Sequence, residues 1–113
     1  MTDKTKTKAL HVSDKEFADT LKKNSMVVVD CYADWCAPCR MVAPVIEELA
    51  GEYEGKVTFA KVDVDSSPGV AMQFGVRSIP TLLFFKDGKL VDQQVGALPK
   101  PALKQRVEAL LTA

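Results

Sequence analysis

The feature of this 113-residue sequence that points most directly to chemistry is a pair of cysteines separated by two residues. Cys36-Ala37-Pro38-Cys39 follows an apolar run and opens a segment with helical periodicity, so Cys36 is expected at or beside a helix N-terminus. Unpaired amides and the helix dipole stabilise a thiolate there, and the thiolate is the species that attacks disulfides. The spacing lets Cys39 meet Cys36 within disulfide distance. The pair therefore predicts thiol-disulfide exchange, in which the first sulfur attacks and the second releases the substrate.

Two other interpretations of the pair stay open at this point. The cysteines could pack in a helix or form a structural clip, or they could join Cys31 and His11 in a zinc site of three thiolates and one imidazole. The sequence has no second CxxC pair, and Cys31 falls in a strand expected to be buried. Too few ligands therefore remain for a four-coordinate zinc site. We therefore expect no metal and no cofactor.

The elements that must position the cysteines follow from the patterns on either side of them. The run over 26–32 is β-branched and apolar on both alternating sets, which predicts a strand covered on both faces of a sheet, interrupted only by Asp30. Helical periodicity over 36–53 predicts a helix, and Pro44 inside it predicts a kink. The apolar face of that helix comprises Val42, Val45, Ile46, Leu49 and Tyr53.

Strands and helices alternate along the rest of the chain. The patterns predict a strand or extended arm at 9–12, a helix at 14–23 begun by the Ser13/Glu16 capping box, a strand at 57–62, a short helix at 68–74 and an interior strand at 81–86. Asp87-Gly88 predicts a two-residue hairpin turn, so the strand at 89–95 should run antiparallel to its neighbour. A closing helix begins at Pro99 or Pro101. The order predicts an α/β fold.

Composition narrows the class of protein. With 47% hydrophobic and 27% charged residues the chain is an ordinary globular sequence, and we expect a flexible lead at 1–8 and one domain at 9–113. Fifteen basic and fifteen acidic side chains cancel, which leaves no long-range field to gather nucleic acid or an anionic membrane. An odd cysteine count, no apolar leader segment and no stretch of about 20 apolar residues favour a cytoplasmic protein.

Four motifs, in order and spacing, resemble the thioredoxin family. VDCYADWCAPCR at 29–40 is similar to its active-site segment, and KVD at 61–63, VRSIPT at 76–81 and VGA at 95–97 are similar to its other landmarks. The resemblance covers about residues 12 to 112, and Pro38 favours this family over protein disulfide isomerases and glutaredoxins, which typically have His and Tyr there. Ala37 stands where Gly is most frequent and Tyr32 where Trp is frequent, which leaves the reduction potential open.

The resemblance implies a thioredoxin fold, with a mixed central β-sheet flanked by helices and a C-terminal antiparallel hairpin and helix. It implies a protein-disulfide reductase, an electron carrier in cell redox homeostasis whose redox-active disulfide joins Cys36 and Cys39. Its partners would be disulfide-containing proteins and a thioredoxin reductase, with no nucleic acid or membrane, and the chain would be a monomer. A disulfide oxidant or isomerase and a non-catalytic binding module are the alternatives.

The resemblance also implies roles for residues outside the CxxC pair. Asp30 would accept the proton of Cys39, since burial raises the pKa of a carboxyl, although it could instead be a structural residue satisfied by the backbone or by Lys61. Lys61 would tune Asp30 or extend from its strand to water. Ile79-Pro80 would be a cis-proline loop. The substrate-binding surface would comprise Trp35, Ala37, Pro38, Ile79, Pro80, Gly96 and Ala97. Cys31 is expected to be a small buried hydrophobe more than a regulatory thiol.

Overall fold

The computed structural model describes residues 9–113, and the lead predicted at 1–8 lies outside the described residues. In chain order its elements are β1 (Leu10–His11), α1 (Asp14–Lys23), β2 (Met26–Tyr32), α2 (Ala37–Glu52), β3 (Thr58–Asp63), α3 (Pro68–Gln73), β4 (Thr81–Lys86), β5 (Lys89–Val95) and α4 (Lys100–Thr112). Each predicted element is present to within one or two residues. The segment at 9–12 is a short strand, and the closing helix begins between the two prolines proposed for its start.

The strands form one mixed sheet in the order β1-β3-β2-β4-β5. β3 pairs in parallel with both β1 and β2, whereas β4 is antiparallel to β2 and β5 is antiparallel to β4. The turn between β4 and β5 holds Asp87 at φ 52° and Gly88 at φ 81°, the positive values that a two-residue primed turn requires. The predicted mixed sheet with a C-terminal antiparallel hairpin is therefore confirmed.

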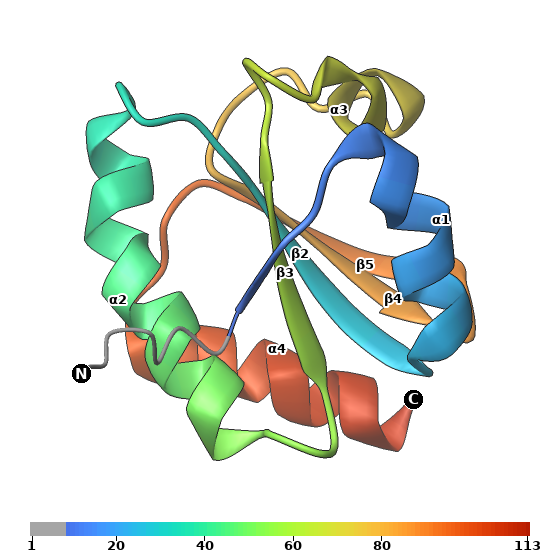
Figure 1. Ribbon diagram of the computed structural model, residues 1–113. Helices are drawn as coiled ribbons and strands as arrows, with labels where there is room; N and C mark the ends of the chain where they lie inside the picture. Colours follow the sequence, from blue (N-terminus) through green and yellow to red (C-terminus); the bar gives the residue numbers. More distant parts are fainter. Residues whose placement is uncertain (1–8) are drawn as a thin grey trace, which may run out of the picture.

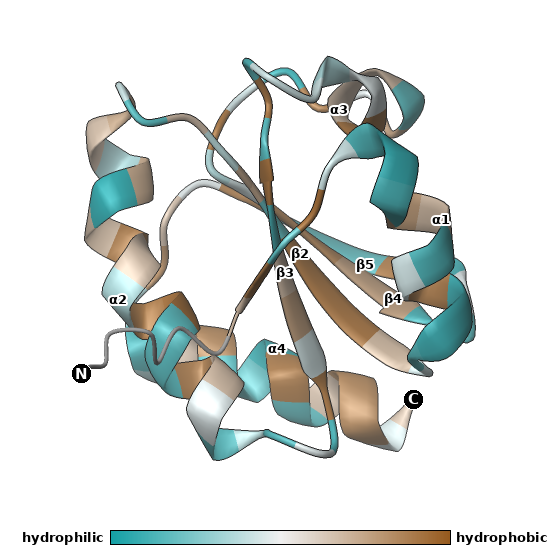
Figure 2. Ribbon diagram, viewed as in Figure 1, coloured by the Kyte–Doolittle hydropathy of each residue, from teal (hydrophilic) through white to brown (hydrophobic). Residues whose placement is uncertain are grey.

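Two pairs of helices cover the two faces of the sheet (Figure 1). α2 and α4 pack on one face, where Ile46 and Leu103 join Val28 of β2 in a single apolar cluster. α1 and α3 pack on the other face, where Phe17 and Val70 join the remaining apolar side chains of β2 and β4. The central strands are accordingly hydrophobic along most of their length, and the outer side of α1 is hydrophilic (Figure 2). Burial on both faces explains why β2 is apolar on both of its alternating sets.

Local signals set the ends of the helices. At the start of α1 the carboxylate of Glu16 accepts hydrogen bonds from the backbone amide of Ser13 at 2.9 Å and from its hydroxyl at 3.0 Å. α2 is continuous through Pro44, and the kink expected there stays a prediction. None of the helices in residues 9–113 is long and apolar enough to cross a membrane. The C-terminal end of β2 leads directly into α2, which brings the two cysteines to this edge of the sheet.

Candidate active site

A disulfide joins Cys36 and Cys39 at the start of α2, with their Cα atoms 5.2 Å apart. Cys36 is the N-cap residue of the helix, and its Sγ accepts a hydrogen bond from the backbone amide of Cys39 at 3.2 Å. Both cysteines are almost fully buried, at 4% and 3% exposure. The expectation that Cys36 lies at a helix N-terminus is confirmed. When the pair is reduced, the same amide and the helix dipole favour a thiolate on Cys36.

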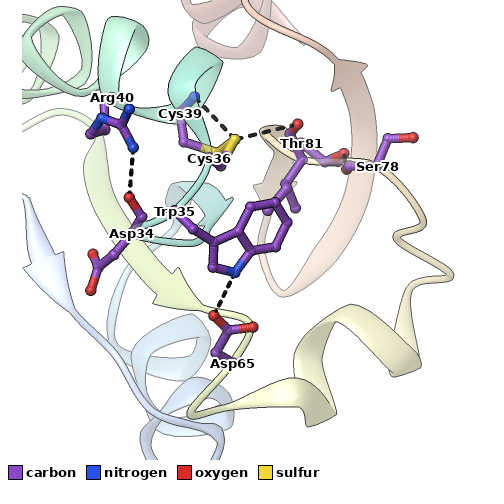
Figure 3. The surroundings of a disulfide bond; sticks show 9 residues. Asp34, Trp35, Cys36, Cys39, Arg40, Asp65, Ser78 and Thr81 are labelled. Carbon is purple, nitrogen blue, oxygen red and sulfur yellow. Dashed lines mark hydrogen bonds between the residues drawn. A yellow bond between two sulfur atoms is a disulfide. The ribbon is translucent and has the colours of Figure 1, made fainter.

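The loop that precedes the disulfide is held from two sides (Figure 3). The indole Nε1 of Trp35 donates to Oδ2 of Asp65 at 2.8 Å, which ties the loop to the segment after β3. The guanidinium of Arg40 donates to the backbone carbonyl of Asp34 at 2.9 Å, which ties the loop to the first turn of α2. These contacts were not anticipated, because the sequence carries no signal that pairs Trp35 with a residue thirty positions away. They hold Trp35 beside the cysteines while leaving it 68% exposed.

The segment that leads into β4 faces the disulfide. The Ile79-Pro80 peptide bond is cis, as the resemblance implied, and the Ile79 carbonyl oxygen lies 3.7 Å from the Sγ of Cys36. The Pro80 carbonyl accepts from the Gly96 amide at 2.8 Å, so the segment after β5 is fastened to the same loop. The loop at Ile79-Pro80 thus contacts both the start of α2 and the segment after β5.

The residues expected to form a substrate-binding surface lie together but differ in exposure. Trp35, Ala37, Pro38 and Ala97 are exposed, whereas Ile79 and Gly96 are half-buried. Pro80 is buried, so its side chain adds no exposed area and its contribution is the shape of the loop. This corrects the expectation that Pro80 adds to the exposed surface.

Asp30 is the buried charge of the site. It is 1% exposed, and neither of its carboxyl oxygens has a hydrogen-bond partner within residues 9–113. Burial raises the pKa of Asp30 to about 7, and the positive charge of Lys61 acts in the opposite direction. The structural explanation considered for Asp30, a carboxyl satisfied by the backbone or by Lys61, therefore lacks the hydrogen bonds that it requires. A buried carboxyl without hydrogen-bond partners lowers the stability of the fold when it is ionised.

Lys61 lies opposite Asp30 in the β2–β3 register. Its Nζ lies 4.7 Å from the centroid of the Tyr32 ring, so the side chain is directed over the aromatic face while its charge still acts on the buried carboxyl. The pKa of Tyr32 is raised by its partial burial and by the negative charges of neighbouring aspartates. Both behaviours expected of Lys61, tuning Asp30 and extending away from its strand, are therefore compatible with its position.

Cys31 lies in the centre of the sheet and is fully buried. Burial, together with the nearby charge of Asp30, raises the pKa of its thiol to about 12, which removes its reactivity at neutral pH. Over residues 9–113 no three His, Cys, Asp or Glu side chains gather closely enough to hold a metal ion, so His11 and the three cysteines do not come together as a ligand set. Cys31 behaves as the small buried hydrophobe that was expected.

The fold and the disulfide together define a thiol-disulfide oxidoreductase. The family model described as Thioredoxin matches residues 8–109. Thioredoxin 1 of Nostoc sp. is 52% identical over 101 residues, covering 88% of this chain and 94% of the relative, and thioredoxin 2 of Chlorobaculum tepidum is 50% identical over 102 residues, covering 89% and 94%. The structure of a mutant thioredoxin from Halobacterium salinarum superposes with a TM-score of 0.84 at 39% identity and 93% coverage of each chain.

This chain belongs to the thioredoxin family. The predicted fold and the predicted activity, reduction of disulfides by dithiol-disulfide exchange, are confirmed by these relationships. At the level of the family, its substrates are disulfide-containing proteins, and a reductase returns the oxidised pair to the dithiol.

Proposed function

We propose that this chain reduces disulfides in other proteins with Cys36 as the nucleophile and Cys39 as the resolving thiol. The Cys36 thiolate attacks one sulfur of the substrate disulfide, forming a mixed disulfide and releasing the other substrate sulfur as a thiolate. Cys39 then loses its proton and attacks the Sγ of Cys36, which releases the second substrate sulfur. Two electrons pass from the dithiol to the substrate, and the Cys36–Cys39 disulfide is the oxidised product.

One observation carries this assignment of roles. The Sγ of Cys36 accepts the Cys39 amide at the N-terminus of α2, a contact that stabilises negative charge on the first cysteine. The facing Ile79-Pro80 loop supports the same assignment, because it offers backbone groups to an extended substrate chain beside Cys36. Trp35, Ala37, Pro38 and Ala97 supply exposed apolar area, and Gly96 and Ile79 continue it.

Asp30 serves in this proposal as the proton acceptor for Cys39. Side chains alternate along a strand, so Asp30 points to the same face of the sheet as Val28, the face covered by α2, which carries Cys39. A carboxyl with a pKa of about 7 is suited to exchange protons at neutral pH. Lys61 tunes that pKa through its charge.

The proposal extends to the setting in which the chain works. Residues 9–113 would act as a single monomeric domain, in the cytoplasm, recycled by a thioredoxin reductase. Its formal net charge of zero is in keeping with protein partners selected by local contacts, without nucleic acid or membrane surfaces.

Reduction of insulin disulfides with a recycling reductant tests the cycle. Cys36→Ser and Cys39→Ser should each abolish turnover, because each removes one half of the exchange. Non-reducing gels and mass spectrometry should find targets trapped through Cys36 in Cys39→Ser and few adducts in Cys36→Ser. Equal trapping by both variants would contradict the assignment of Cys36 as the nucleophile. Full turnover by either variant would contradict the two-step cycle.

A further inference from the structure

An apolar groove of about 370 Å³ runs along α2 beside the disulfide. All of its lining residues are apolar: Met41, Val42, Val45, Ala97, Leu98 and Pro99. Val42 is buried and forms the floor, whereas Met41 is 74% exposed. An exposed methionine on an apolar groove is a flexible wall that can adapt to different occupants.

The groove begins next to the reactive sulfur. Met41 lies four residues after Ala37 and Val45 four residues after Met41, so the three share one face of α2. Met41 follows Cys36 by five residues, which at 1.5 Å per residue is about 7.5 Å along the helix axis. The opposite wall follows β5, and its first residue adjoins Gly96, whose amide is hydrogen-bonded to Pro80. The groove therefore continues from the surface around the disulfide.

Charged side chains follow the lining residues on both α2 and the segment after β5. The Nζ of Lys100, directly after Pro99, contacts Glu48 at 2.9 Å and Glu52 at 2.5 Å, one and two turns beyond Val45 on α2. These ion pairs join the start of α4 to α2. An apolar lining flanked by charged side chains is the arrangement typical of a protein-binding surface.

We infer that this groove binds an apolar side chain of the substrate protein, two or three residues away from the cysteine that Cys36 attacks. The inference rests on the proposed function, since attack brings the substrate sulfur to Cys36 and lays its flanking residues over the adjacent surface. An extended chain advances about 3.3 Å per residue, so two to three residues span the distance to Met41. The preferred substrate class is thus protein disulfides with a Leu, Met or Phe close to one cysteine.

Matched cystine peptides test this preference. In one series a single Leu is placed at each position from four before to four after the attacked cysteine, and the reference peptide has Ser at all of them. The parent should reduce the best Leu peptide with a kcat/KM roughly 5- to 10-fold above the Ser peptide, chiefly through KM, as expected from partial burial of one aliphatic side chain. Met41→Ser should bring that ratio close to one, and Met41→Leu should restore it.

Met72 provides the matched control, because it is 78% exposed on α3 and away from the groove. Met72→Ser should keep the parental ratio. An unchanged ratio in Met41→Ser, or a parent that reduces all peptides equally well, overturns the groove assignment while the proposed function stands. Failure of the parent to reduce any peptide, with the reference small disulfide 5,5′-dithiobis(2-nitrobenzoate) reduced, counts against the proposed function itself.

Discussion

Asp30 is the residue whose energetics are most clearly set by its position. Burial raises the pKa of its carboxyl from 3.8 to about 7. The folded protein therefore holds this proton more tightly than the unfolded chain does. Below about pH 4 the carboxyl is protonated in both states, so its ionisation costs no stability; between that pH and 7 stability falls as pH rises, and above 7 the full cost is present. A pKa difference of this size between the two states corresponds to roughly 4 kcal/mol.

Replacing Asp30 with Asn tests separately the effect of its ionisation on stability and its proposed role in proton transfer. Asp30→Asn should match the parent in stability near pH 4 and exceed it by roughly 4 kcal/mol near pH 8, because the amide never ionises. Resolution of the mixed disulfide should slow, because the variant lacks the carboxyl proposed to accept the proton of Cys39, while attack by Cys36 continues. Urea denaturation of the oxidised protein across this pH range and single-turnover kinetics measure the two effects.

Two results together would exclude Asp30 from the proposed mechanism. A variant that resolves the mixed disulfide at the parental rate, and whose stability shows the same pH dependence as the parent, would make Asp30 neither the proton acceptor nor the group responsible for the pH-dependent loss. A variant that gains stability but resolves the mixed disulfide at the parental rate would show that ionisation of Asp30 destabilises the fold, and that Asp30 is not the proton acceptor.

At the scale of elements, a side chain of α1 caps α3. The carboxylate of Asp14 accepts hydrogen bonds from the backbone amides of Gly69 at 2.8 Å and Val70 at 3.0 Å. α3 is short and leads through the following segment to Ile79-Pro80, so the cap helps to fix the start of the segment that faces the disulfide. The approach is close, since a Cβ at Gly69 would lie 2.8 Å from Oδ2 of Asp14.

Removing this cap should destabilise the protein. Asp14→Ala is expected to lower the free energy of unfolding by about 1 to 2 kcal/mol, because two backbone amides lose a charged acceptor. Asp19→Ala is the matched control on the same helix, where an exposed ion pair with Lys23 is worth at most about 0.5 kcal/mol. Chemical denaturation of both variants measures the difference, and equal losses would show that the cap contributes nothing of its own.

A double-mutant cycle tests the close approach separately. Gly69→Ala should cost more stability in the parent than in the Asp14→Ala background, where the clashing carboxylate is gone. Additive effects would mean that the two residues do not restrict one another.

At the scale of the whole molecule, the formal charges cancel, and the proposed function has local contacts select the substrate. The formal net charge is zero, and an ionic strength of about 0.1 M already screens exposed charges beyond about 10 Å. We expect kcat/KM for insulin reduction to change by less than about twofold between about 0.02 and 0.3 M salt, because the proposed substrate contacts are apolar surface and backbone groups. Steady-state assays across this range provide the measurement. A fall of tenfold or more would reveal a charged docking surface instead.

Much of the local structure of this protein could be predicted from sequence patterns that act over a few residues. The β-branched run of β2, the Ser13–Glu16 capping box and the Asp87-Gly88 turn each specify local backbone geometry, since the groups that satisfy one another lie within a turn or a hairpin. The CxxC spacing belongs to the same class, because one helical turn brings the second cysteine back to the first. The order of elements along the chain and the class of chemistry could therefore be predicted.

Contacts between elements that are distant in the sequence, and the burial that results from them, were decided only by the tertiary structure. Only the folded chain pairs Trp35 with Asp65, leaves both oxygens of Asp30 without partners among residues 9–113 and buries Pro80 beneath its loop. It also sets Met41 across from Leu98, on segments more than fifty positions apart. Periodicity indicates which face of an element is buried but carries no information on which remote side chain will lie against it. That choice is made when the layers pack, because burial and unpaired polar groups are then set for all elements at once.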